Sequence, residues 1–131
     1  MSKHQQYNLV FQKLKVSDNV YWAVCRVTHG GENSPLEGEL RSILGSSNEG
    51  EGLVDTLLEE TNKILTGTWS GFEENGDNTF FTETNESIRL DLVDGYAYLG
   101  QEDYGWNQLP RISLIDLKAI LEEWISFRNS M

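Results

Sequence analysis

The dipeptide Asp94-Gly95 constrains the fold more than any other feature, because it separates two runs in which apolar and polar residues alternate. The surrounding residues 86–100 read ESIRLDLVDGYAYLG. Asp-Gly favours the two-residue type I′ turn that joins antiparallel strands. We therefore predict a tight hairpin with a defined register. The expected cross-strand pairs are Val93 with Tyr96, Leu92 with Ala97, Asp91 with Tyr98 and Leu90 with Leu99.

This register sorts the side chains of the hairpin into two faces, since successive residues of a strand point to opposite sides. One face is apolar and is expected to lie on the core; it holds Ile88, Leu90, Leu92, Ala97 and Leu99. The other face mixes aromatic and charged groups; it holds Arg89, Asp91, Val93, Tyr96 and Tyr98. A sheet face that meets only water does not need aromatic side chains, so the second face is a candidate binding surface.

Two further hairpins are predicted from runs of β-branched and aromatic residues. The first joins residues 7–16 to residues 20–27 through the polar turn Ser17-Asp18-Asn19. The second joins residues 68–72 to residues 79–84 around a polar tip that contains Asn75-Gly76.

Helical spacing of apolar residues predicts three helices. A short helix is expected within residues 36–44, and a longer one over residues 53–65 with Gly67 as its C-terminal cap. The third helix begins at the cap Ser113 with Asp116 three residues on, and its apolar stripe is Leu114, Leu117, Leu121 and Trp124. The predicted fold is a single α+β domain over residues 1–131, with an antiparallel sheet of hairpins packed against two or three helices.

The charge of the chain is strongly negative and unevenly distributed. The sequence has 21 acidic and 10 basic residues, a net charge of −11. Residues 73–103 carry −8 and residues 29–72 carry −6, whereas residues 1–28 carry +3. Phosphate backbones and anionic lipids are held chiefly by Lys and Arg, so we expect neither nucleic acid nor a membrane as a partner. Although acidity often serves solubility alone, the chain is also suited to a basic protein partner.

Aromatic residues interleaved with carboxylates are typical of a surface that binds a cationic protein. The candidate partner-binding residues are Glu73, Glu74, Asp77, Asp91, Tyr96, Tyr98, Glu102, Asp103, Tyr104 and Trp106. The competing interpretation is that Trp106 and some of the tyrosines pack at the rim of the sheet.

The recognisable catalytic and metal-binding spacings do not occur in the sequence. His4, in an N-terminus that is expected to fray, and His29, in a loop, lie far from any Glu-x-x-His pattern. Residues 45–52 are rich in glycine but lack the Lys-Ser/Thr of a phosphate-binding loop. We therefore predict a protein without catalytic activity, metal or cofactor. Adjacent carboxylates such as Glu73-Glu74 keep a two-carboxylate hydrolase open as an alternative.

Cysteine usage indicates a reducing compartment, because Cys25 is the only cysteine and no intramolecular disulfide can form. Its apolar strand neighbours predict a buried, unreactive thiol. The N-terminal residues show no apolar run of a signal peptide, and no stretch of the sequence reaches the length of a membrane span. The sequence therefore predicts a cytoplasmic protein.

The last eighty or so residues resemble the small acidic immunity proteins of bacterial contact-dependent growth inhibition and related polymorphic toxin systems. The resemblance rests on LVDTLLEETNKILTG at residues 53–67, on the acidic hairpins, and on LPRISLIDLKAILEEWISF at residues 109–127. Membership would imply an antitoxin-like protein that neutralises a cognate toxin domain, often a nuclease with a basic cleft. We expect a monomer that forms a 1:1 complex with that toxin. The alternative is a small acidic adaptor or secretion-type chaperone, which should be an obligate dimer.

Overall fold

The structure is a computed structural model, and it describes residues 2–28, 35–44, 51–69, 79–81, 87–90, 95–100 and 109–130. Within these ranges the chain forms four helices and two antiparallel sheets, one of two strands and one of four. The predicted α+β class is confirmed. None of the described helices combines the length and the apolar character that a crossing of the bilayer requires.

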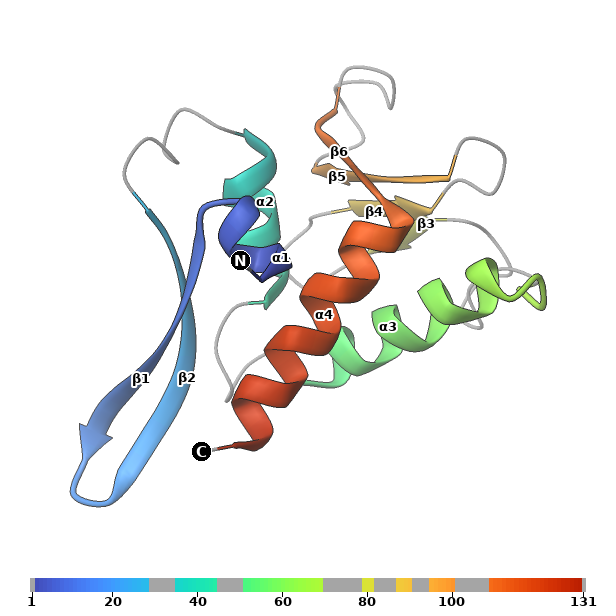
Figure 1. The fold of residues 1–131 in the computed structure, drawn as a ribbon. Coiled ribbons are helices and arrows are strands. Elements are labelled where there is room, and N and C mark those ends of the chain that lie inside the picture. The colour runs from blue at the N-terminus through green and yellow to red at the C-terminus, as the bar shows by residue number, and fades with distance from the viewer. Residues whose placement is uncertain are drawn as a thin grey trace.

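The described elements follow one another in a simple order. They are α1 (Lys3–Gln6), β1 (Leu9–Ser17), β2 (Val20–Val27), α2 (Pro35–Leu44), α3 (Glu51–Leu65), β3 (Thr79–Phe81), β4 (Ser87–Leu90), β5 (Tyr96–Gly100), β6 (Arg111–Ser113) and α4 (Leu114–Asn129). Figure 1 shows α4 running across the middle of the molecule beside α3, with the β3-β4-β5-β6 sheet at its start. The hairpin of β1 and β2 extends from the opposite side.

Helix α4 supplies much of the core, as its apolar stripe predicts. Its buried side chains are Leu114, Leu117, Ile120, Leu121 and Trp124. The helix begins at the predicted cap, where Ser113 Oγ accepts a hydrogen bond of 3.2 Å from the backbone N–H of Asp116. That bond satisfies one of the amide groups that a helix start leaves unpaired. The predicted packing of this helix on the sheet is confirmed by its contacts with β5 and β6.

Helix α3 ends in a glycine cap that also corrects one prediction. Gly67 has φ +78°, and the backbone N–H of Thr68 donates to the carbonyl of Lys63. This pairing is typical of a Schellman cap. Thr68 and Trp69 were predicted to begin a strand, but neither lies in one. The cap uses the amide of Thr68, and the indole of Trp69 donates back to Glu60 Oε2 on α3 at 2.7 Å.

The start of the second predicted strand, residues 79–84, is confirmed as β3 (Thr79–Phe81), and residues 82–84 lie outside the described ranges. Strand β3 pairs with β4 through Phe80 opposite Ile88, a pairing that was not predicted. The remaining residues of the first predicted strand, 70–72, lie outside the described ranges.

The hairpin of β4 and β5 forms, but its register differs by two residues from the predicted one. Leu90 lies opposite Ala97, and Ile88 lies opposite Leu99. Strand β5 is also bound on its other side, where Leu114 donates to the carbonyl of Gly95 at 2.9 Å. Strand β5 thus has partners on both sides, β4 on one and β6 with the start of α4 on the other. Because the shift is an even number of residues, every described side chain stays on its predicted face.

The N-terminal hairpin is confirmed, with Leu9 opposite Val27 and Lys15 opposite Tyr21. Asn19 takes the turn position with φ +60°. Every side chain of residues 12–21 is exposed, and Figure 1 shows this part of β1 and β2 extending away from the helices. We call residues 12–21 the arm.

The N-terminus does not fray as predicted. Residues 3–6 form α1, which packs on α4 and β1. The contacts that hold it, described below, join residues more than 100 positions apart, so no local pattern could indicate them.

Candidate functional site

The candidate binding face lies on β5 and β6 of the four-stranded sheet. Ala97 and Leu99 of β5 are 0% exposed and point into the core. Tyr96 and Tyr98 alternate with them, so both tyrosines lie on the opposite face, where each is partly buried. This is the division into faces that the sequence predicts for β5.

Arg111 of β6 joins the two tyrosines on this face. It lies opposite Tyr98 in the register, and its guanidinium lies over the ring of Tyr96, 4.3 Å from the ring centroid. Such a cation–π contact fixes the orientation of both groups. Arg111 is not among the predicted binding residues, because β6 was not predicted. Residues 111–113 do alternate between polar, apolar and polar types, as a strand would. Three residues are too few to distinguish a strand from a loop.

Of the ten predicted partner-binding residues, the described part of the chain holds Tyr96 and Tyr98, and it places them together on one strand. The other eight lie outside the described residues: Glu73, Glu74, Asp77, Asp91, Glu102, Asp103, Tyr104 and Trp106. Two groups of these acidic residues flank the sheet in the sequence. Residues 73–78 directly precede β3, and residues 101–106 directly follow β5.

A carboxylate on the first turn of α4 binds the N-terminal segment beside this face. Asp116 accepts a hydrogen bond of 2.6 Å from the hydroxyl of Tyr7, and it forms an ion pair with Lys3 Nζ at 3.3 Å. The hydrogen bond from Tyr7 and the positive charge of Lys3 hold the pKa of Asp116 below its usual value. Burial and the neighbouring carboxylate raise the pKa of Tyr7, with a smaller contribution from Tyr96. The tyrosine hydroxyl therefore stays a hydrogen-bond donor at neutral pH.

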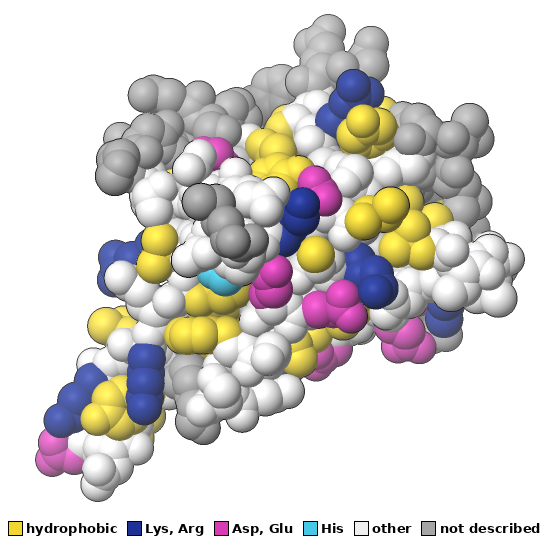
Figure 2. Space-filling model, viewed as in Figure 1, with side chains coloured by type: hydrophobic (Ala, Val, Ile, Leu, Met, Phe, Trp, Pro, Cys, Tyr) yellow, Lys and Arg dark blue, Asp and Glu magenta, His cyan; other side chains and the backbone are white. Residues whose placement is uncertain are grey.

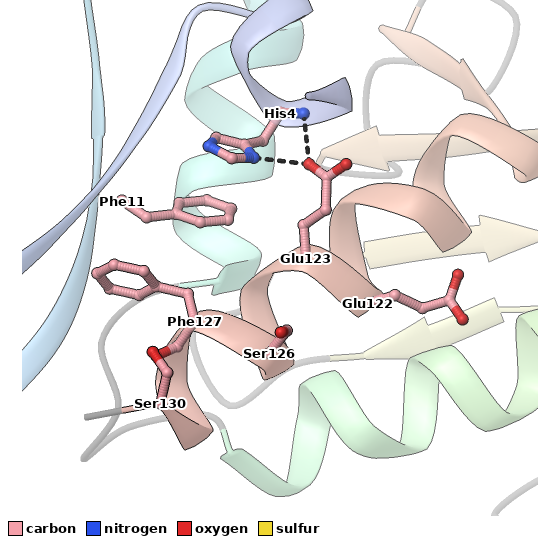
Figure 3. A pocket seen from close by; sticks show the side chains of 7 residues that line it. All are labelled: His4, Phe11, Glu122, Glu123, Ser126, Phe127 and Ser130. Carbon is pink, nitrogen blue, oxygen red and sulfur yellow. Dashed lines mark hydrogen bonds and ion pairs between the residues drawn. The ribbon is translucent and has the colours of Figure 1, made fainter. Parts of the chain in front are cut away.

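A second carboxylate, Glu123, binds α1 two turns further along α4. Its Oε1 accepts from the backbone N–H of His4 at 2.9 Å and lies 2.6 Å from His4 Nδ1. Its Oε2 accepts from the backbone N–H of Lys3 at 2.9 Å. Burial alone would raise the pKa of Glu123, but these hydrogen bonds outweigh it and hold the pKa below its usual value. Figure 3 shows the two contacts between Glu123 and His4. We call Asp116 and Glu123 with their N-terminal partners the clasp.

Acid should weaken the clasp. A carboxyl whose pKa is lowered by folding contributes stability at pH values above the pKa of the unfolded chain, and that stability is lost as pH falls through the folded pKa. At pH 7 we expect Glu123→Gln to lower the free energy of unfolding by about 1–2 kcal/mol, through the weakened charged hydrogen bonds. The difference from the wild type should shrink below about pH 4. Urea titrations of both proteins at a series of pH values measure this difference in the free energy of unfolding. A difference that is as large at pH 3 as at pH 7 would contradict this account.

A shallow groove lies beside the clasp, between β1 and α4, with a volume of about 510 Å³. It is lined by His4, Phe11, Glu122, Glu123, Ser126, Phe127 and Ser130, which Figure 3 labels. The ring of His4 stacks on Phe11 with 3.8 Å between centroids, and Phe11 meets Trp124 edge-on at 5.0 Å. Aromatic packing and the clasp thus hold the wall of the groove rigidly.

No serine that lines the groove contacts the ring of His4; the hydroxyl that does so belongs to Ser2, outside the lining, with its Oγ 3.2 Å from His4 Nδ1. Ser130 Oγ donates to the carbonyl of Phe127 at 2.7 Å, and in Figure 3 the second ring nitrogen of His4 points away from both serines. No group of three or more His, Cys, Asp or Glu suited to a metal ion occurs within the described ranges. Burial raises the pKa of the Cys25 thiol to about 12, which agrees with the inert cysteine predicted from its apolar strand.

The adjacent carboxylates on helices differ in burial and in their partners. Glu60 is 4% exposed and binds Trp69, its neighbour Glu59 is exposed, and both pair with Lys63 Nζ, at 3.7 Å and 3.6 Å. Glu123 faces α1, while Glu122 pairs with Lys118 at 3.3 Å. The Glu122-Glu123 pair therefore does not form the converging carboxylates of a two-carboxylate hydrolase.

Comparison with protein families, with curated proteins and with solved structures finds no match to this chain.

Proposed function

We propose that the chain is an antitoxin-like immunity protein that acts in the cytoplasm, where it binds and neutralises a cognate toxin domain, with a nuclease as the expected toxin. The observation that carries the proposal is the partly buried tyrosine face of β5, in a chain whose net charge is −11 and whose acidic residues are concentrated in the sequence on either side of that strand. The class that this sequence resembles neutralises cognate toxin domains, which are often nucleases with a basic cleft.

The tyrosine face has the properties of an interaction hot spot. Tyrosine combines a large apolar ring with a polar tip and loses little conformational entropy on binding. Here the rings stand on a strand that is paired on both sides, and Arg111 covers the ring of Tyr96. The clasp also fixes the start of α4 beside them. A partner therefore meets a preorganised surface, which lowers the entropic cost of binding.

The charge supports a basic partner. A nuclease holds phosphate with Lys and Arg, so its substrate cleft attracts an acidic protein. The acidic residues 73–78 and 101–106 adjoin the ends of β3 and β5 in the sequence. We expect these carboxylates to steer the encounter and the tyrosines to slow release.

Rescue of growth tests the function directly. In a bacterial host, the toxin domain encoded beside the gene for this chain should arrest growth when expressed alone, and co-expression of the chain should restore it. The purified proteins should form a 1:1 complex. Growth arrest that persists despite folded, abundant chain would overturn the proposal.

Salt should act on the association rate. Because screening weakens attraction between charges beyond the Debye length, the rate constant for association with that toxin domain should fall at least about tenfold between low salt and physiological ionic strength. The dissociation rate should change less, since it depends on contacts at short range. Stopped-flow measurements separate the two. An association rate constant that does not change with salt concentration would contradict electrostatic steering.

A further inference from the structure

The strands of the four-stranded sheet are basic, although the chain is acidic. Strands β3, β4, β5 and β6 read TFF, SIRL, YAYLG and RIS, so they contain Arg89 and Arg111 and no acidic residue. The chain as a whole carries −11. In the register, Tyr98 pairs with Arg89 of β4 on one side and with Arg111 of β6 on the other. The basic positions of this sheet therefore adjoin the strand that carries the tyrosine face.

Arg111 presents its guanidinium to solvent on this face. Its side chain is exposed and lies over the ring of Tyr96, 4.3 Å from the ring centroid. Figure 2 shows dark blue atoms against a yellow side chain over β6, at the top of the view. A cation–π contact orients a guanidinium without satisfying its five N–H donors. Those donors form a planar fork that matches the two oxygens of a carboxylate.

Arg111 has no carboxylate partner among the described residues, unlike most basic side chains of the helices. Four of those side chains form ion pairs within the chain: Lys3, Lys63, Lys118 and Arg128. A protein that covers an unpaired arginine removes its water, which opposes binding unless the partner supplies an acid in its place. A partner that covers the tyrosine face is therefore favoured if it carries a carboxylate opposite Arg111.

We propose that Arg111 binds a carboxylate of the cognate toxin domain and thereby determines which toxin the chain recognises. The inference rests on the proposed function and refines it, because the toxin surface that meets the tyrosine face is then not uniformly basic but holds an Asp or Glu side chain. The overall charge of −11 attracts any basic protein. One cation within the contact discriminates among basic proteins, because it repels those with a Lys or Arg at the same place.

Nucleic acid is a less suitable occupant of the same face. Phosphate backbones are bound by many basic groups at once, and affinity rises with the number of phosphates that are neutralised. The strands of this sheet offer two arginines, in a chain that repels polyanions overall. A carboxylate that lies within a basic protein surface fits both the local and the overall charge.

Arg111→Glu separates this contact from the effect of net charge. The substitution makes the chain more acidic, so it would strengthen binding to a basic toxin domain if net charge alone governed the affinity. We expect the opposite result, a Kd at least about tenfold higher, because an attraction at short range becomes a repulsion. Arg111→Gln, which removes the charge without reversing it, should raise the Kd by a smaller factor. Calorimetric titration with the full chain measures the Kd, and urea unfolding shows whether each variant is folded.

Arg41→Glu is the matched control, because it makes the same change of charge at an exposed position on α2, outside the sheet. It should leave the Kd within about twofold of the wild-type value, or lower it. Replacing each surface Asp and Glu of the toxin domain with Lys, one at a time, identifies the carboxylate. One of these toxin variants should bind wild-type chain less tightly and should bind the Arg111→Glu chain at least about tenfold more tightly than the unmodified toxin does.

The outcomes distinguish this inference from the function on which it rests. If the wild-type chain does not bind the toxin domain, the proposed function fails and the role of Arg111 fails with it. If the wild-type chain binds but Arg111→Glu binds as tightly or more tightly, the role of Arg111 alone is overturned. The same holds if no toxin variant restores binding of Arg111→Glu. Binding of a single-stranded RNA oligonucleotide to the chain alone, abolished by Arg111→Glu, would also overturn the inference and assign Arg111 to phosphate.

Discussion

Replacing Trp124 with alanine should lower the free energy of unfolding by about 3–5 kcal/mol, because the substitution removes a large buried ring and leaves a cavity. The Trp124 side chain is 1% exposed, meets Phe11 edge-on at 5.0 Å and stacks near Phe127 at 6.3 Å. Its loss should therefore loosen the contact of α4 with the N-terminal hairpin as well as the core. Urea unfolding followed by far-ultraviolet circular dichroism measures the change.

Ile115→Ala is the matched control on the same helix. Ile115 is 69% exposed, so its truncation should change the free energy of unfolding by no more than about 0.5 kcal/mol. A cost below about 1 kcal/mol for Trp124→Ala would show that α4 is not the centre of the core.

Replacing Tyr98 with alanine should weaken binding of the toxin domain by about 30-fold, equivalent to about 2 kcal/mol. The substitution removes the ring that stands opposite Arg111 on the candidate face. Its cost in stability should be smaller than that of a core residue, because the ring lies on the face opposite Ala97 and Leu99. Calorimetric titration of the toxin domain with the wild type and with Tyr98→Ala measures the affinity. Urea unfolding of the same two proteins measures the stability.

Leu99→Ala is the control from the same strand, one position along. Leu99 is 0% exposed, so we expect a loss of about 2–5 kcal/mol in the free energy of unfolding with unchanged affinity of the folded fraction. If Tyr98→Ala unfolds the protein and leaves affinity intact, the tyrosine face is structural. The binding surface must then be sought on the acidic segments around Glu73 and Glu102.

Features with local causes could be predicted from the sequence. The α4 start at Ser113 and the α3 end at Gly67 follow from caps whose partners lie within a few residues. The arm follows from two β-prone runs around a polar turn. The core face of β5 follows from the alternation of Ala97 and Leu99 with the tyrosines, and it is unaffected by the error in register.

Features with distant causes could not be predicted. The register of β5 depends on β6 and on the bond from Leu114 to Gly95, which no turn preference encodes. Trp69 leaves the predicted strand because Glu60 offers an acceptor nine residues earlier. For the same reason Arg111 was missed, since its place beside Tyr96 exists only once β6 pairs with β5.

The clasp imposes an order on biosynthesis. His4 and Glu123 are 119 residues apart, so α1 has no partner until α4 has been translated. At about 5–20 residues per second, the N-terminal hairpin waits for roughly 6–24 s with the face that Trp124 will cover still open to water. During that interval the nascent chain is a substrate for chaperones and proteases, and a ribosome that stalls before Ser113 releases a product that cannot complete its core.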